Sequence, residues 1–137
     1  MSINNSSMQH LFIIQDVIKR MANNSLILKI MAMVLFCMFL AIAYSIDNAR
    51  WLVVLHLPLA VLWVLDAFYL QQERLYRALY DKVRKLPEHE VDFDMRASPK
   101  EFTDTRNQYQ HCFLSKTLLW YYGAIIVSYI CIMLSVF

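Results

Sequence analysis

Three long apolar runs divide the chain and predict three membrane-spanning helices. They comprise 17 uncharged residues at 30–46, 20 residues at 51–70 and 21 residues at 117–137. A helix that crosses a hydrocarbon core of about 30 Å needs roughly 20 residues. Residues 26–28 extend the first run, because Lys29 can carry its ammonium group to the interface on its alkyl chain. The expected fold class is an all-α membrane protein.

Apolar residues also recur with helical spacing before the first run. They follow steps of three and four and share one helical face: Leu11, Ile14, Ile18 and Met21. Residues 1–25 are therefore predicted to form an amphipathic cytoplasmic or interfacial helix. Two placements are open, one in the lipid headgroup plane and one packed on other cytoplasmic helices. Residues 23–25, Asn-Asn-Ser, are expected to break the helix before the first span.

The second span is expected to continue into the cytoplasm as one helix over residues 51–86. Residues 71–86 contain strong helix formers and neither Gly nor Pro. A seam typical of helical bundles runs along this helix: Leu62, Leu65, Tyr69, Gln72, Tyr76, Leu79, Val83 and Leu86. Such a seam needs a partner, so assembly as a homo-oligomer is expected.

The segment that follows is polar and is expected to contain another helix. Pro87 ends the preceding helix, and residues 88–95 are typical of an extended acidic connector. Residues 98–101, Ser-Pro-Lys-Glu, have a capping-box pattern that predicts a new helix start. The expected divisions are an N-terminal helix, a transmembrane hairpin, a cytoplasmic helical segment and a third transmembrane helix, at 1–25, 26–70, 71–116 and 117–137.

The distribution of basic residues orients the spans. Of the 13 Lys and Arg, nine lie between Arg74 and Lys116, three precede the first span and one, Arg50, lies in the hairpin loop. Basic residues favour the cytoplasmic side. We therefore expect a bacterial inner-membrane protein with a cytoplasmic N-terminus and a C-terminus near the periplasmic face.

Composition excludes several protein classes. Hydrophobic residues make up 59% of the chain and charged residues 18%, with a single Gly and three scattered Cys. Collagen-like, disordered and disulfide-stabilised chains have other compositions. The chain lacks a Gly-rich phosphate loop, HExxH, paired CxxC and GxSxG, so we expect no enzyme, no catalytic residue and no cofactor. The acidic residues at 88–94 are read as a solvated loop rather than a metal site.

Two ionisable residues within the second span are candidates for lining an ion path. His56 and Asp66 interrupt an apolar run, and such residues usually face a bundle interior or a water-filled path. Alternatively, Asp66 pairs with Lys29 or Arg74 near the cytoplasmic interface. For His56, two residues before Pro58, the alternative is a bond to a neighbouring carbonyl.

A basic cluster on the cytoplasmic extension is a candidate for anionic ligands: Arg74, Arg77, Lys82, Arg84 and Lys85. Tyr76 and Tyr80 lie between these cations. Several copies around an axis would present a ring suited to a short oligonucleotide through charge and stacking. The alternative is a juxtamembrane basic helix that fixes topology and meets anionic lipid. The eight acidic residues between Glu73 and Asp104 argue against a general nucleic-acid surface.

Three stretches carry a family resemblance: residues 14–25 (IQDVIKRMANNS), 63–80 (WVLDAFYLQQERLYRALY) and 92–95 (DFDM). They resemble a widespread family of small bacterial inner-membrane proteins over most of the chain. Small multi-span proteins of this kind are similar to membrane effectors of nucleotidyltransferase-linked anti-phage systems such as Hailong, whose effector is an oligomeric channel controlled by a DNA oligomer. The resemblance implies a nucleotide or short oligonucleotide signal and a nucleotidyltransferase partner, and it assigns no residue roles.

The function expected from these features is an oligomeric ion channel or pore, gated through its cytoplasmic helices. The ionisable residues within the spans and the seam that lacks a partner motivate this expectation. The alternative is a non-conducting membrane anchor or scaffold that recruits a soluble protein through the same cytoplasmic helices.

Overall fold

In the computed structural model most of the described residues belong to three long helices. The structure describes residues 3–46 and 53–136. In these ranges it has four α-helices and two short 3₁₀ turns, and no β-strand: α1 (Ile3–Ile46), α3 (His56–Val83), η1 (Glu88–Glu90), η2 (Thr105–Asn107), α4 (Tyr109–Phe113) and α5 (Lys116–Val136). The all-α class is confirmed.

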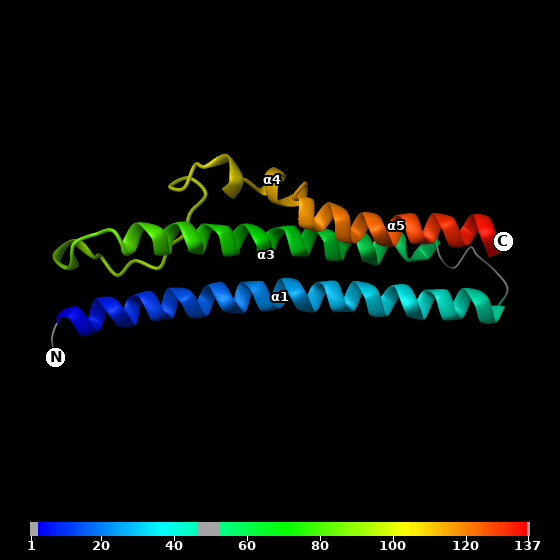
Figure 1. The fold of residues 1–137 in the computed structure, drawn as a ribbon, viewed down its shortest axis with the longest axis horizontal. Helices are drawn as coiled ribbons and strands as arrows, with labels where there is room; N and C mark the ends of the chain where they lie inside the picture. Colours follow the sequence, from blue (N-terminus) through cyan, green and yellow to red (C-terminus); the bar gives the residue numbers. More distant parts are fainter. Residues whose placement is uncertain (1–2, 47–52, 137) are drawn as a thin grey trace.

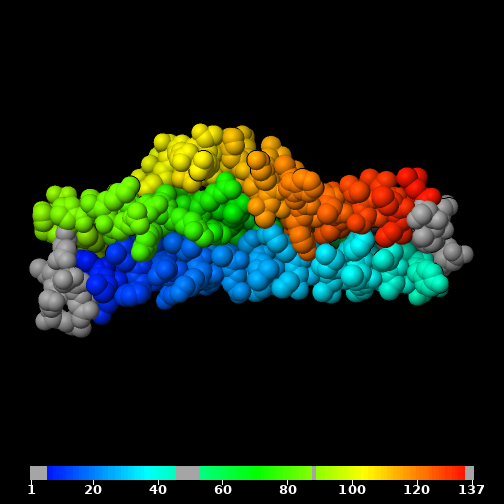
Figure 2. All heavy atoms as spheres, in the orientation of Figure 1, coloured from blue at the N-terminus to red at the C-terminus, as the bar shows by residue number. Residues whose placement is uncertain are grey.

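The molecule is a rod built on an antiparallel pair of helices, α1 and α3 (Figure 1). Helix α5 lies along the half of α3 that is near the end of α1. The segment between α3 and α5 covers the other half of α3 and forms the bulge on the surface in Figure 2. The N-terminus lies at one end of the rod and the C-terminus at the other (Figure 1).

Two of these helices are long and apolar enough to cross a membrane. They are α1, over Ser6–Ser45, and α5, over Lys116–Leu134. Of the apolar run at 51–70, residues 56–70 belong to α3, residues 53–55 precede it, and residues 51 and 52 lie outside the described ranges. The hairpin loop with Arg50 and residues 1 and 2 also lie outside these ranges.

Helix α1 is continuous, so the break expected at residues 23–25 is wrong. Its 44 residues correspond to about 66 Å, roughly twice the thickness of the hydrocarbon core. Ser25 keeps its place inside the helix because its hydroxyl bonds Asp66 of α3 instead of capping a helix end. A tertiary contact of this kind overrides the weak local preference of Asn and Ser for helix ends.

The part of α1 before Ser25 packs on α3, which was one of the two placements left open. Ile14 is fully buried and clusters with Leu79 and Val83. The connector adds the half-buried Val91 and Phe102 to this cluster. The helical spacing of apolar residues in this stretch therefore matches a helix-packing face.

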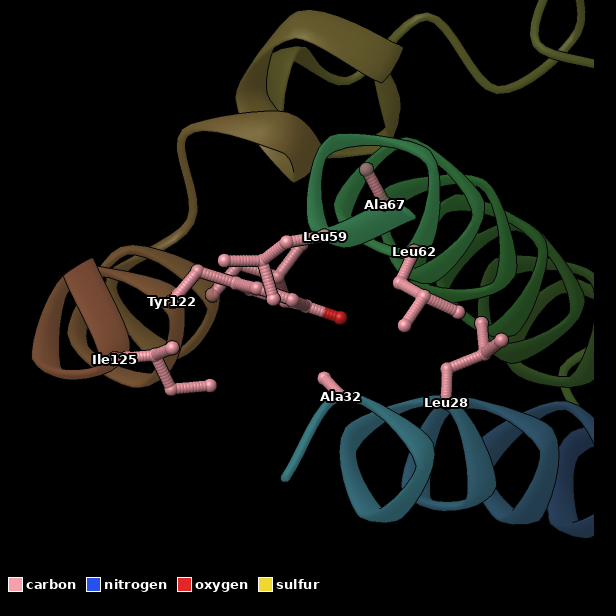
Figure 3. Close-up of a cluster of buried hydrophobic side chains, with 8 residues drawn as sticks. Leu28, Ala32, Leu59, Leu62, Ala67, Tyr122 and Ile125 are labelled. Atoms are coloured by element: carbon pink, nitrogen blue, oxygen red, sulfur yellow. The ribbon is translucent and has the colours of Figure 1, made fainter. Parts of the chain in front are cut away.

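A second cluster joins all three long helices (Figure 3). Its buried members are Leu28, Ala32, Leu59, Leu62, Ala67, Leu118, Tyr122 and Ile125. Ala32 and Ala67 are fully buried. Small side chains at such positions let helix backbones approach one another closely, as at helix contacts in membranes.

The seam expected along α3 matches its buried face only in part. Leu62, Leu79 and Val83 are buried, whereas Leu65 is 41% exposed. The other four seam residues are half-buried: Tyr69, Gln72, Tyr76 and Leu86. Helix α3 contacts α1 and also α4 and α5, so its buried residues do not all lie on one face. The buried residues of α3 are Leu59, Leu62, Asp66, Ala67, Gln71, Leu75, Leu79 and Val83. The partner of the buried seam residues is therefore α1 of the same chain.

Two helix boundaries differ from the expected ones. Helix α3 ends at Val83, and residues 84–86 form a turn before Pro87. Residues 98–101 form a single turn, closed by the N–H of Phe102 on the carbonyl of Ser98 at 3.1 Å, so the predicted helix start there is wrong. Glu101 bonds Lys82 of α3 at 2.6 Å and does not complete a capping box. The next α-helix begins at Tyr109, after the 3₁₀ turn η2.

Replacing Ile14 with Ala should destabilise the half of the rod in which the start of α1 packs on the end of α3. Removing a fully buried Ile side chain leaves a cavity and typically costs about 2–5 kcal/mol. Thermal unfolding of the purified protein should show a clear drop in Tm. Ile27→Ala, at a 45% exposed position of the same helix, is the matched control and should shift Tm little. Equal shifts for both variants would contradict the packing described here.

Candidate functional site: a buried ion pair that joins three helices

A buried carboxylate lies where α1, α3 and α5 meet. Asp66 of α3 is 0% exposed, and Lys29 of α1 is the cation beside it. The Lys29 Nζ lies 2.7 Å from Oδ2 and 2.9 Å from Oδ1 of Asp66, so the ammonium group donates to both oxygens. Lys29 was one of the two partners considered for Asp66, and Arg74 bonds elsewhere.

Hydroxyl groups from two helices complete this site. Ser25 lies one turn before Lys29 on the same face of α1; its hydroxyl donates to Asp66 and accepts from Lys29 Nζ at 2.7 Å. The Tyr122 hydroxyl donates to Oδ2 of Asp66 at 3.3 Å, and the Tyr121 hydroxyl donates to the backbone carbonyl of Lys29 at 2.6 Å. Figure 3 shows the hydroxyl of Tyr122 pointing from α5 towards α1 and α3. We call these five residues the polar cluster.

The position of the polar cluster along the helices makes the ion pair costly to break. Tyr122 is six residues, about 9 Å, beyond the first residue of α5, Lys116. Lys29 is 17 residues, about 25 Å, before the end of α1 at Ile46. The polar cluster thus lies within the apolar stretches of α1 and α5, towards the Lys116 end of α5. Removing one partner from such a pair leaves an uncompensated charge in a medium that solvates it poorly.

The second ionisable residue of the apolar run at 51–70 has a different environment. His56 begins α3 and is exposed, with Nδ1 3.1 Å from the carbonyl oxygen of Val53. Its ring meets the ring of Tyr129 on α5 edge to face, with 4.6 Å between centroids. His56 and Asp66 are ten residues, about 15 Å, apart along α3, so the structure does not bring them together. That either lines an ion path stays a prediction.

The basic cluster on α3 is largely paired within the chain. Arg77 lies 2.7 Å from Glu73, Lys82 lies 2.6 Å from Glu101, and Arg84 lies 3.4 Å from Asp81. Such exposed pairs are screened by solvent and contribute little to stability. The hydrogen bond and charge of Glu101 raise the pKa of Lys82, which stays protonated at neutral pH.

Arg74 binds the segment between α3 and α5. Its guanidinium donates to the carbonyl of Arg106 at 2.7 Å and contacts the Sγ of Cys112 at 3.6 Å. Burial raises the pKa of the Cys112 thiol, and the charge of Arg74 acts in the opposite direction. Arg74 therefore fixes η2 and α4 against α3. Lys85, the last member of the basic cluster, is exposed.

Sequence reasoning missed Ser25 and the two Tyr hydroxyls of the polar cluster. The spacing of Ser25 and Lys29 by four residues was a usable signal, because it places them on one helical face. Tyr121 and Tyr122 are also expected at a membrane interface from their residue type alone. Only the packing of α5 shows that their hydroxyls reach α1 and α3.

Neither comparison with known proteins nor the placement of metal-ligating side chains assigns a role to these residues. The chain matches no protein-family model, no curated protein and no solved structure. Within the described ranges, no group of three His, Cys, Asp or Glu is placed to hold a metal ion.

Replacing one member of the ion pair should destabilise the protein far more than replacing both. Asp66→Leu or Lys29→Met leaves one buried charge, which typically costs about 3–5 kcal/mol. The double variant leaves none and should recover most of the loss of Tm in thermal unfolding. Asp81→Asn, which removes an exposed pair with Arg84, is the control and should have little effect. Additive losses in the double variant would contradict a direct pair.

The Cys112 thiol should react slowly with maleimide in the folded protein. It is 0% exposed and its pKa is raised, so little thiolate is available. Mass spectrometry of a Cys37→Ser, Cys131→Ser variant should show labelling that becomes fast only after denaturation. Rapid labelling of the native variant would show that α4 does not hold Cys112 against α3 in solution.

Proposed function

We propose that this chain is a subunit of an oligomeric ion channel or pore in the bacterial inner membrane, gated through its cytoplasmic helices by a nucleotide or oligonucleotide signal. The observation that carries the proposal is the polar cluster. It contains an ion pair next to the apolar stretches of the long helices. Helix α1 continues from this pair without a break into the half of the rod that we place in the cytoplasm.

The proposal includes three spans. The apolar run at 51–70 forms the second, so that the hairpin loop and the C-terminus share the periplasmic side. The basic residues support this orientation, because nine of 13 lie between Arg74 and Lys116. With α1 crossing at residues 26–46, its first half extends into the cytoplasm beside the second half of α3.

Exposed apolar side chains in the cytoplasmic half support an oligomer. Met8, Phe12 and Ile13 are 54%, 60% and 54% exposed on α1. In the proposed arrangement they lie outside the hydrocarbon core, where an apolar patch is typical of a protein contact. We assign this patch, Met8-Phe12-Ile13, to contact between subunits.

The ion pair is suited to serve as the gate contact. Asp66 is enclosed in this conformation, so a path past it requires α1 to move away from α3 and α5. Because α1 is continuous, a displacement of its cytoplasmic half is passed to Lys29 and Ser25 within the membrane. Separation would admit water to the polar cluster, as ionisable groups in spans commonly line such paths.

The nucleotide signal follows from the family resemblance and from the basic residues of α3. The signal would hold the helices in the paired arrangement, and loss of the signal would release them. Release would collapse ion gradients and halt growth, which fits an effector of abortive anti-phage defence with a nucleotidyltransferase partner.

A charge in the apolar patch should weaken both assembly and conduction. Phe12→Glu should lower the mass of the intact complex measured by native mass spectrometry and reduce ion flux in liposomes by about tenfold or more, because a buried unpaired carboxylate destabilises a subunit contact. Gln110→Glu, which adds the same charge at an exposed position on α4, is the matched control. A wild-type monomer without flux would contradict the proposal.

A non-conducting anchor or scaffold is the second candidate function. The exposed Met8-Phe12-Ile13 patch also fits a soluble partner protein. A stoichiometric soluble protein that copurifies with the wild type and is lost in Phe12→Glu, together with no ion flux from pure wild-type protein, would favour this function.

A further inference from the structure

A charged pocket lies between the cytoplasmic part of α3 and η2, outside the polar cluster. Its volume is about 540 Å³, within the range of small-molecule sites. Five charged side chains from these two parts of the chain line it: Arg74, Arg77, Asp81, Asp104 and Arg106. Arg106 was not among the candidates from sequence, because only the fold brings it to α3.

The backbone around Arg106 is firmly held. Asp104 accepts the N–H of Arg106 at 3.2 Å, and the Arg106 carbonyl accepts from Arg74 at 2.7 Å. One residue further, the carbonyl of Asn107 accepts from Gln71 of α3 at 3.0 Å. Three hydrogen bonds thus fix the base of this side chain.

The guanidinium of Arg106, in contrast, is exposed and has no bonding partner among residues 3–46 and 53–136. Arg77 beside it bonds Glu73 through Nε at 2.9 Å and keeps further N–H donors. The pocket therefore holds guanidinium donors on a fixed frame. Such donors match the oxygens of a phosphate group, often two at a time.

The two carboxylates narrow the class of ligand. Asp81 and Asp104 repel a simple anion, and they accept hydrogen bonds from amino or hydroxyl groups. A ligand that bonds both the guanidinium groups and the carboxylates of the pocket combines a phosphate with hydrogen-bond donors. Nucleotides have this chemistry, and so do amine-bearing phospholipid headgroups.

We propose that the pocket formed by Arg74, Arg77, Asp81, Asp104 and Arg106 binds a phosphate ester that also carries hydrogen-bond donors. For a soluble nucleotide this deepens the function proposed above, because it locates the site of the signal. The bound ester would join η2 to α3 and so stabilise the arrangement of α3, α4 and α5 seen here.

The position of the pocket makes a lipid headgroup an alternative source of the same chemistry. Arg74 lies eight residues, about 12 Å, beyond Asp66 along α3 on the cytoplasmic side. This distance brings the pocket close to the expected membrane surface. The experiment must therefore separate a soluble nucleotide from a lipid.

The test is calorimetric titration of the purified full-length protein in a maltoside detergent, which contains no phosphate. The probes are the dinucleotide pdApdA, short-chain phosphatidylethanolamine and inorganic phosphate. Saturable binding of the dinucleotide or of the lipid supports the proposal and identifies the source. Arg106→Gln should weaken that binding about tenfold or more through loss of charge-assisted bonds. Asp81→Asn should weaken binding of the esters and not that of inorganic phosphate.

Arg96→Gln is the matched control, because Arg96 bonds Asp94 on the connector and does not line the pocket. Absence of saturable ester binding, or equal losses in Arg96→Gln and Arg106→Gln, would overturn the proposal. Liposome flux measured on the same samples separates the two claims. Binding without flux would contradict the channel proposal and support the binding site. Flux without binding would contradict the binding site and support the channel proposal.

Discussion

The arrangement of the three long helices depends on satisfying one buried carboxylate. Asp66 has no access to solvent, so each of its oxygens must find a donor within the protein. Lys29 and Ser25 supply donors from α1, and Tyr122 supplies one from α5. A shift of either helix by one turn would leave the charge unpaired. The polar cluster therefore sets the register of three helices whose other described contacts are mainly apolar packing.

The continuity of α1 connects this cluster to the opposite half of the rod. One end of α1 packs through Ile14 on the last turns of α3, and Ser25 and Lys29 lie further along the same helix. The cluster around Ile14 and the ion pair are thus joined by one continuous helix. Arg74 adds a second link, because its bonds to Arg106 and Cys112 hold η2 and α4 against α3 just outside the apolar zone. A ligand at this link would act on the same helix that carries Asp66.

Much of the fold followed from sequence patterns, and the exceptions have physical causes. Apolar runs and helical spacing predicted an all-helical chain with long apolar helices, and Ile14 marked the packed face of α1. The break at residues 23–25 was wrong because Ser25 has a partner, Asp66, that lies 41 residues away in sequence. The helix start at Ser98 was wrong because Lys82 of α3 binds the Glu that a capping box requires. Local propensity cannot report such distant partners.

The candidate site was predicted in outline. An Asp inside an apolar run indicated a functional or paired residue, and Lys29 was one of its two expected partners. The hydroxyl donors were beyond prediction, because their roles depend on how α5 rotates against α3. The position of Arg106 beside Arg77 could not be predicted either, because it depends on how the segment between α3 and α5 folds back onto α3. The seam on α3 indicated that a partner was needed, and α1 fills that role for its buried residues.

In the proposed channel the Lys29–Asp66 pair controls an ion path through the membrane, and single-channel recording on a charge-swapped protein is the direct test of this role. Asp66→Lys alone places two cations together and should raise the open fraction in planar bilayers well above that of the wild type. Lys29→Asp combined with Asp66→Lys restores an opposite pair and should return the open fraction towards the wild-type value. Absence of current from all three proteins, or equal open fractions in the single and swapped variants, would contradict the account.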